Sequence, residues 1–422
     1  MRWVAVEAVP PGSVLGRDLY LGDRTLLRAG VRLSQPMLDR LAELGFETLC
    51  VCDPGEVPTA PPTELLTDQT RQQAAQALKR YVKRLQRGYA GDLRPIAAAV
   101  SQILDEVLAN PSVLLELTAI RGILDEQEYL FAHSVRVAAL SVLLGIHSGL
   151  EPRELTVLGM GAILHDVGKI RIPQSILTKQ GPLTDDERAL IRLHPIHGFE
   201  ILRRHRELDR RAVHVAYQHH ERWDGSGYPR GLKGEEIHRF ARLAAVADVF
   251  DALTSPRPYR PAWPVHRALA LIEEEAGRSF DPAVVRTFLA RVAPYPVGTL
   301  VRLNTGEEAL VVRLNAIAPA RPVVRIWCGS AEGAELDLLV HLERRIVGPV
   351  TGWGREAPPW SRARNGGRRL HQLDAVAPEP LVHLDEVGQE LGEAHELAEE
   401  GDVEVTGVAL SELDQDLPVD ER

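Results

Sequence analysis

Residues 219–229 read His-His-Glu-Arg-Trp-Asp-Gly-Ser-Gly-Tyr-Pro, and the interpretation of the whole chain depends on this stretch. Adjacent residues of a helix point about 100° apart, so His219 and His220 can share one large cationic centre only from a helix end. The glycines behind them permit tight turns, and Tyr228-Pro229 stiffens the loop. The alternative is a pair of surface histidines before an ordinary turn. Further metal ligands elsewhere in the chain would favour the first interpretation.

The negative charge of the chain lies mainly in its C-terminal tail. The 422 residues carry a formal net charge of −10. Residues 371–422 hold 16 acidic side chains and one Arg, whereas the other 370 residues hold 48 basic and 43 acidic side chains. Acidic segments with few aromatic residues cannot bury enough apolar surface to fold. We therefore expect a mildly basic folded body and a disordered acidic tail.

Changes in composition divide the chain into five parts. We expect a small mixed α/β module over residues 1–60, a helical connector over 64–124, a helical domain over 125–293 that holds the candidate functional residues, a small β module over 294–350 and the acidic tail over 351–422. The stretch Pro54–Pro62 contains four prolines and is typical of a linker. After Pro294 the apolar residues alternate, which indicates strands.

Composition also bears on location and partners. The sequence contains no apolar run long enough to span a membrane and no secretory start, and its three cysteines form no disulfide framework. We therefore expect a cytoplasmic protein without a membrane span. DNA binding is not expected, because no basic stripe is interleaved with aromatic residues. A protein partner bound through the tail or the N-terminal module, and a homodimer, are left open.

Seven candidate metal ligands occur within or at the ends of predicted helices, as in helical bundles that hold metals in their cores. They are His133, His165, Asp166, His194, His219, His220 and Asp248. Seven ligands suit two ions that share a bridging carboxylate, and Asp166 is the natural bridge. Mixed imidazole and carboxylate ligation favours iron or manganese, leaves zinc open and disfavours calcium and magnesium. The alternative is a set of unrelated helix histidines.

Together these motifs resemble the HD-GYP subfamily of the HD metal-dependent phosphohydrolases over about residues 120–290. The resemblance rests on His165-Asp166-Val167-Gly168-Lys169, His194-Pro195, His219-His220-Glu221, Asp224–Pro229, Ala247–Thr254 and Arg257–Arg260. It implies a mainly α fold built on an HD-type helical bundle, a centre of two or three metal ions, and hydrolysis of cyclic di-GMP. Members with a third metal usually carry Glu four residues before the first His, where this chain has Tyr129; Glu128 is one position away. We therefore expect two ions.

The expected chemistry assigns further residues. Two metals would lower the pKa of a bridging water and neutralise phosphate charge, so that Asp166 and Lys169 are the expected catalytic residues. The substrate-binding residues expected are Lys169, Gly227, Tyr228, Asp251, Arg257 and Arg260. Tyr228 could stack on a guanine or hydrogen-bond the ligand, and the arginines offer forked donors to the second phosphate. The alternatives are a lysine favoured by a helix C-terminus and two solvated arginines.

The leading functional hypothesis is hydrolysis of cyclic di-GMP to linear pGpG by a metal-bridging hydroxide, with GMP as a later product left open. A second hypothesis keeps the metals and changes the substrate to another cyclic dinucleotide or a nucleotide. A third is a cyclic di-GMP-responsive docking protein without turnover. The presence of all seven ligands argues against the third.

Overall fold

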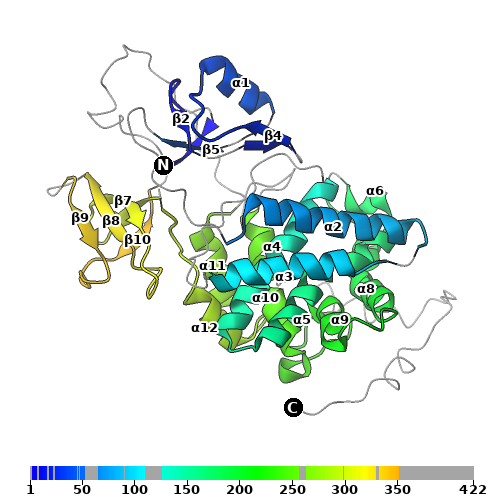
Figure 1. Cartoon of the computed structure of the whole chain (residues 1–422). Coiled ribbons are helices and arrows are strands. Elements are labelled where there is room, and N and C mark those ends of the chain that lie inside the picture. The colour runs from blue at the N-terminus through cyan, green and yellow to red at the C-terminus, as the bar shows by residue number, and fades with distance from the viewer. Residues whose placement is uncertain are drawn as a thin grey trace. The chain divides into compact units, whose positions relative to one another are not determined.

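The computed structural model describes residues 2–6, 9–16, 19–21, 24–44, 46, 48–52, 65–89, 91–109, 126–179, 181–255, 263–297, 299–328 and 332–350. These residues form three parts, each with its own secondary structure (Figure 1). The expected linker at Pro54–Pro62 and the expected acidic tail at 351–422 lie outside the described residues.

The N-terminal part is a small mixed α/β module. It contains β1 (Arg2–Ala5), β2 (Val14–Leu15), β3 (Leu19–Leu21), β4 (Arg24–Leu27), α1 (Gln35–Glu43) and β5 (Thr48–Cys52). An antiparallel sheet has the order β1-β5-β2, and β3 pairs with β4. Leu15, Leu33 and Leu49 are fully buried in its core. From the sequence we predict a short helix after Ser34 and a closing strand at Thr48–Cys52, and both are confirmed.

The central part is helical and carries the candidate ligands. Its helices are α2 (Asp68–Gln86), α3 (Arg94–Ala109), α4 (Glu126–His147), α5 (Pro152–Leu164), α6 (Gln174–Leu177), α7 (Asp185–Arg192), α8 (His194–Leu202), α9 (Arg210–Gln218), α10 (Arg239–Thr254), α11 (Val265–Glu274) and α12 (Pro282–Leu289), with 3-10 turns at Val167–Arg171 and Gly234–Glu236. The helices α2 and α3 pack on α4 and α5 (Figure 1). The expected connector and catalytic domain therefore share one core.

Helices α4 and α5 form the centre of that core. Eight residues of α5 are buried, as its nearly uniform apolar sequence predicts. The window Leu130–His147 of α4 has a mean hydropathy of 1.5 and is the single described segment that could cross a membrane by length and composition. However, 78% of this window is buried inside the protein, and it holds the buried polar residues His133 and Arg136. These properties are those of a core helix.

The helices around His194 differ from the expectation in one respect. From the sequence, Thr184-Asp185-Asp186-Glu187 is a capping box that predicts one helix carrying His194; the box does form, but it opens α7, which ends at Arg192. His194 instead begins the next helix, α8. Pro195 lies in the first turn of α8; it has no N–H to donate to the carbonyl of Ile191, and its ring would clash with that carbonyl, so the hydrogen-bond ladder of α7 cannot continue through it. The chain therefore breaks at Leu193, and His194 occupies a helix start.

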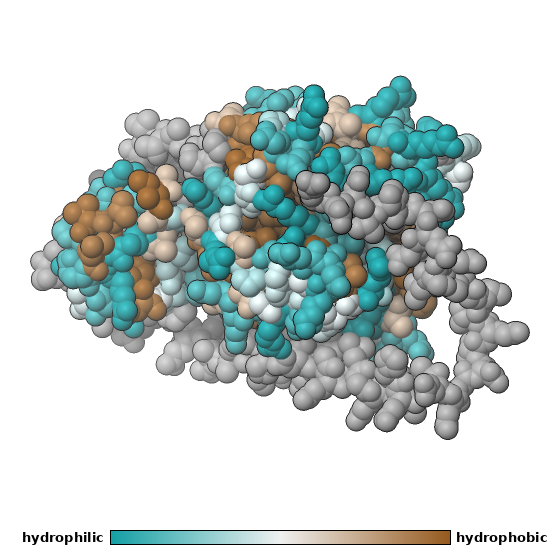
Figure 2. Space-filling model, turned by 90° about the horizontal axis from the view of Figure 1, so that it is seen from below, coloured by the Kyte–Doolittle hydropathy of each residue, from teal (hydrophilic) through white to brown (hydrophobic). Residues whose placement is uncertain are grey.

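The C-terminal described part is a β module. It contains β6 (Leu300–Leu303), β7 (Glu308–Arg313), β8 (Val323–Cys328), β9 (Glu335–Asp337) and β10 (Ile346–Pro349), in the antiparallel order β10-β6-β7-β8-β9. Alternate residues of β6, β7 and β8 fill its core, as the sequence pattern predicts. Apolar side chains gather on a face of this module in Figure 2, and Ile317, Val340 and Leu342 are among its exposed ones.

Candidate metal centre

All seven predicted ligands lie together in the helical part. They fall into three groups whose ligand atoms lie within 4.8 Å of one another: His194, His219 and His220; His133, His165 and Asp166; and His165, His219 and Asp248. The second and third groups share His165, and the first and third share His219. The structure therefore supports the prediction of one extended cluster over the alternative of unrelated helix histidines.

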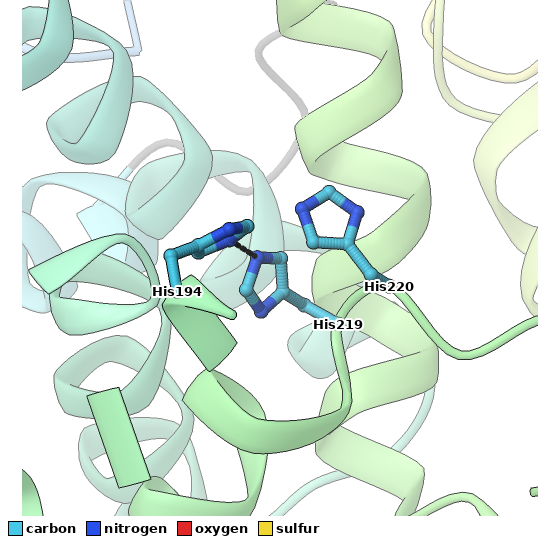
Figure 3. A group of neighbouring side chains, drawn as sticks. All are labelled: His194, His219 and His220. Carbon is cyan, nitrogen blue, oxygen red and sulfur yellow. Dashed lines mark hydrogen bonds between the residues drawn. The ribbon is translucent and has the colours of Figure 1, made fainter. Parts of the chain in front are cut away.

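Five segments deliver these ligands. His133 lies on α4 and Asp248 on α10, whereas His165 and Asp166 follow α5 directly. His194 begins α8, and His219 and His220 follow the last residue of α9, as expected for two adjacent histidines at a helix end (Figure 3). Most ligands therefore lie at helix ends, where the backbone turns and adjacent side chains can point to one centre.

Gly168 permits the close approach of α8 to the turn after α5. A Cβ atom at this position would lie 1.9 Å from the carbonyl oxygen of His194 and 2.5 Å from the nitrogen of Gly198. Contacts of that length do not occur between nonbonded atoms, so any larger residue would push α8 away. The glycine three residues after His165 thus brings His194 to Asp166, where His194 Nε2 lies 3.4 Å from Asp166 Oδ1.

The imidazole rings are oriented by hydrogen bonds behind the cluster. In His165, His194 and His219, Nδ1 lies 2.7, 2.7 and 3.1 Å from the carbonyl oxygen of the residue three positions earlier. A carbonyl oxygen only accepts, so Nδ1 carries the proton in each ring. In the neutral ring Nε2 then carries the lone pair. All three rings consequently present a ligand atom to the cluster.

The ligand atoms that face the cluster are mostly hydrogen-bond acceptors, so they cannot all form hydrogen bonds with one another. His194 Nε2 and His219 Nε2 lie 3.3 Å apart, with both lone pairs in the same space (Figure 3). His165 Nε2 and Asp166 Oδ1 are buried without a hydrogen-bond partner in the described residues. Buried acceptors without a partner cost free energy unless a cation or donor joins them. The donor set therefore fits divalent metal ions.

The electrostatics of the cluster agree with this fit. Burial lowers the pKa of His194 to about 4, and the nearby Lys169 ammonium adds to the effect. Burial also holds the pKa of His219 well below its ordinary value, as do the neighbouring His165 and His194. Both rings are therefore neutral at pH 7, which is the protonation state in which imidazole binds a metal.

The carboxylates of the cluster are ionised. Burial raises the pKa of Asp166, but the charge of the Lys169 ammonium and the other interactions that favour the anion outweigh burial and hold this pKa well below its ordinary value. Burial likewise raises the pKa of Asp248, and its hydrogen bond with His133 is among the interactions that lower it well below the usual range. Two anionic carboxylates beside the neutral rings of His194 and His219 form a donor set that can bind a divalent cation.

Asp251 lies behind His133 instead of facing the open side of the cluster. Its Oδ2 lies 2.7 Å from His133 Nδ1 and 3.0 Å from Arg136 Nη2, and its Oδ1 lies 2.5 Å from Arg136 Nε. Ser255 Oγ donates a further hydrogen bond to the same carboxylate. Asp251 is 1% exposed. Asp251 thus contacts the candidate ligand His133 in the way that residues which orient a metal ligand do, and its expected contact with substrate stays a prediction.

Arg136 is the residue of this network that sequence reasoning missed. It follows His133 by three positions on α4 and is 7% exposed. A buried arginine requires a carboxylate partner, so its presence in an apolar helix next to a candidate ligand was the available signal.

Lys169 extends from the 3-10 turn after His165-Asp166 to the cluster. Its Nζ lies 2.6 Å from Asp166 Oδ2, and its side chain is 23% exposed. An ammonium that is partly open to solvent and touches a candidate bridging carboxylate is placed to meet an anionic substrate. Its position supports the predicted role.

The glycine-rich loop lies over the His220 side of the cluster. The Tyr228 ring stacks on the His220 ring with centroids 4.8 Å apart and an interplanar angle of 16°. A Cβ atom on Gly227 would lie 2.2 Å from the nitrogen of Arg222 and 2.5 Å from Cα of Glu221, so this close approach requires glycine. Tyr228 and Gly227 therefore border the cluster, as expected of residues that meet a ligand there.

Glu221 restrains the same loop through hydrogen bonds. Its buried carboxylate accepts hydrogen bonds from the backbone N–H groups of Arg230, at 2.8 Å, and Leu232, at 2.9 Å. These bonds join the start of the loop to its end. Sequence reasoning assigned no separate role to Glu221, although its place directly after the two histidines was a signal.

The remaining predicted residues fall outside this geometry. Arg257 and Arg260, and the side chains of Glu128 and Tyr129, lie outside the described residues. The histidines that sequence analysis leaves without a metal role do not join any of the three ligand groups in the described part of the chain. For example, His205 contacts Tyr81, and His214 stacks with His238.

Comparison with known proteins identifies a matching family and several relatives. Residues 118–284 match the family described as HD domain. The chain is 38% identical over 274 residues to a cyclic di-GMP phosphodiesterase of Pseudomonas aeruginosa, with 63% of this chain and 65% of the relative covered. It is 47% identical over 156 residues to a cyclic di-GMP phosphodiesterase response regulator of Xanthomonas campestris, with 36% of this chain and 41% of the relative covered.

Another relative is named for a different substrate. A 3′3′-cGAMP-specific phosphodiesterase of Vibrio cholerae is 42% identical over 159 residues, with 37% of this chain and 30% of the relative covered. The chain thus spans less than two thirds of the length of each of these relatives. Residues 118–284, the range that matches the HD domain family, contain all seven candidate ligands, and the relatives above agree with the predicted resemblance to the HD-GYP subfamily.

Proposed function

We propose that this chain hydrolyses a phosphodiester bond of cyclic di-GMP and releases linear pGpG. The observation that carries the proposal is the convergence of seven His and Asp ligands on one buried cluster. Relatives at 38% and 47% identity, which are named cyclic di-GMP phosphodiesterases, support the choice of substrate. One water adds across a P–O bond, which leaves a phosphate on one end of the product and a hydroxyl on the other.

The cluster is proposed to hold two divalent ions, with iron or manganese favoured by its mixed imidazole and carboxylate donors. His133, His165 and Asp248 lie toward one end of the cluster, and His194, His219 and His220 toward the other. Asp166 has one oxygen 3.3 Å from His165 and the other 3.4 Å from His194, so it lies between the two ends. When bound, such ions activate water and neutralise phosphate charge.

Protein side chains supply the remaining requirements. Lys169 is proposed to donate from Nζ to a phosphate oxygen when the substrate displaces part of its contact with Asp166. Tyr228 is proposed to meet the substrate through a hydrogen bond of its hydroxyl group, since His220 already stacks on its ring, and Gly227 holds that part of the loop close. Arg257 and Arg260 remain predicted contacts of the second phosphate. A cytoplasmic location, a protein partner and a homodimer also remain predictions.

A second candidate substrate is 3′3′-cGAMP. The observation that favours it is the 42% identity with a phosphodiesterase whose name specifies that substrate. Cyclic di-GMP and 3′3′-cGAMP differ in one purine base, whereas the two phosphodiesters are the same. The proposed metal chemistry therefore serves both, and only contacts to the bases can separate them.

The test is a direct comparison of the two substrates. Protein loaded with Mn²⁺ or Fe²⁺ under anaerobic conditions is incubated with each dinucleotide, and the products are separated by chromatography. We expect pGpG from cyclic di-GMP, and loss of turnover in His194→Gln. The matched control is His197→Gln on the same helix, because His197 belongs to none of the described ligand groups. If fully loaded protein hydrolyses neither dinucleotide, the proposal is overturned.

A further inference from the structure

Arg192 is a cation beside the cluster to which neither the sequence nor the comparisons assign a role. It is the last residue of α7 and precedes the candidate ligand His194 by two positions. Its side chain is half-buried, and its Cζ atom lies 5.3 Å from the centroid of the Tyr228 ring. The other described neighbour of that ring is His220, which stacks on it. Arg192 and a candidate metal ligand therefore contact the same aromatic ring.

The contact with Tyr228 restrains the guanidinium without using its donors. A cation over an aromatic face is attracted by the ring electrons, and a planar guanidinium can stack there while its N–H groups point outward. Part of the entropic cost of fixing a long side chain is thereby met before a ligand binds. Arg192 is thus partly ordered for binding an acceptor.

Other arginines of the helical part have acidic partners. Arg136 pairs with Asp251, Arg188 with Asp185 and Arg242 with Asp281. Within the described ranges, Arg192 makes no ion pair and no hydrogen bond through its side chain. A half-buried guanidinium with five available N–H donors, beside a cluster that is built for phosphate chemistry, is suited to an anionic oxygen.

We propose that Arg192 binds the phosphodiester of the cyclic dinucleotide that is not being cleaved, and that Tyr228 holds it in place. This inference rests on the proposed function. A cyclic dinucleotide carries two phosphodiesters, and the metal cluster with Lys169 serves only the one that reacts. Binding of the second phosphodiester by Arg192 favours cyclic dinucleotides as substrates, because compounds with a single phosphate gain nothing from this contact.

The experiment compares two substrates in the full chain. We measure kcat and KM for cyclic di-GMP, which has two phosphodiesters, and for bis(4-nitrophenyl) phosphate, which has one. In Arg192→Gln the kcat/KM for cyclic di-GMP, divided by that for bis(4-nitrophenyl) phosphate, should fall about tenfold. The fall should come mainly from a higher KM for cyclic di-GMP, because one charge-assisted hydrogen bond is lost. In Arg192→Lys the fall should be smaller, because the charge remains while the planar stack on Tyr228 is lost.

The matched control is Arg188→Gln, one turn earlier on the same helix. Arg188 pairs with Asp185 on an exposed surface, so its loss should leave the ratio within about twofold. Equal losses for both substrates in Arg192→Gln would indicate a structural role and overturn the proposal. An unchanged ratio would also overturn it.

A binding measurement separates this inference from the proposed function. Cyclic di-GMP is tested as a competitive inhibitor of bis(4-nitrophenyl) phosphate hydrolysis, and its Ki should rise about tenfold in Arg192→Gln. If cyclic di-GMP inhibits but is not hydrolysed, the proposed function fails while the Ki still decides the role of Arg192. If cyclic di-GMP does not inhibit the wild-type protein at all, the role of Arg192 is excluded.

Discussion

The Nε2 atoms of His194 and His219 lie 3.3 Å apart, although each ring already donates from Nδ1 to a backbone carbonyl. Neither ring has a second proton at neutral pH, because burial keeps both pKa values low. Two lone pairs at this distance repel each other unless a cation lies near both. This pair is therefore the most direct structural sign that the cluster is a metal centre.

Metal content provides the first prediction. Anaerobically prepared protein should contain about two iron or manganese ions per chain, measured by elemental analysis, because the ligands lie on either side of Asp166. Chelation should lower the melting temperature, since bound ions stabilise only the folded state. A stoichiometry near three that falls in Glu128→Gln would contradict the two-ion centre.

Asp166 and Lys169 should respond differently to removal. Asp166→Ala should lose both metal and turnover, because the carboxylate that lies between the two ends of the cluster is gone. Lys169→Ala should keep its metal and lose about 10²-fold in kcat, as expected for one electrostatic contact to the reacting phosphate. Elemental analysis and steady-state kinetics on the same preparations check both. Normal turnover in both variants would place the reaction elsewhere.

The Asp251 carboxylate should control metal affinity. Asp251→Asn weakens the contacts with His133 Nδ1 and Arg136, so metal affinity should fall about 10- to 100-fold, as for other residues that orient a ligand. A competitive chelator titration measures this. The matched control is Asp281→Asn, which weakens another buried Asp–Arg pair, with Arg242, away from the histidines. Equal metal affinity in the two variants would refute the orienting role.

Gly227 should be required for the position of the loop. Gly227→Ala places a Cβ 2.2 Å from the nitrogen of Arg222, so the loop that carries Tyr228 must move. We expect metal content to stay normal and KM for cyclic di-GMP to rise at least about tenfold, equivalent to roughly 1.4 kcal/mol. Gly198→Ala is the control, because its Cβ would meet only ordinary contacts of 3.6 Å or more. A Gly227→Ala variant with wild-type KM would show that the loop does not position substrate contacts.

The acidic tail should be dispensable for turnover. It lies outside the described residues, and its prediction rests on 16 acidic side chains and one Arg within residues 371–422. Truncation after Gly354 should leave the folded domains and keep kcat/KM within a few fold, consistent with an electrostatic effect of about 1 kcal/mol. Circular dichroism and kinetics of the truncated chain check this. Loss of folding would show that the tail is structural.

The sequence by itself determined the elements and the identities of the ligands. Local apolar periodicity predicts helices at about Glu126–His147 and Pro152–Leu164 and a strand at Val323–Cys328, and the bounds of α4, α5 and β8 agree with these ranges. The seven ligands could be named because imidazole and carboxylate groups recur at helix ends in an apolar setting. In contrast, the separation of α7 from α8 was missed, because the break in the hydrogen-bond ladder at Pro195 competes with a continuous helical pattern.

Only the tertiary structure decided which ligand atoms face the centre of the cluster and which residues contact the ligands from the other side. Arg136 and Asp251 are 115 residues apart, so no local pattern shows that this carboxylate contacts His133. Arg192 and Tyr228 likewise meet only because α7 and the glycine-rich loop converge beside His220. Local periodicity reports burial and element type, whereas the direction of a side chain depends on packing between elements that are distant in the sequence.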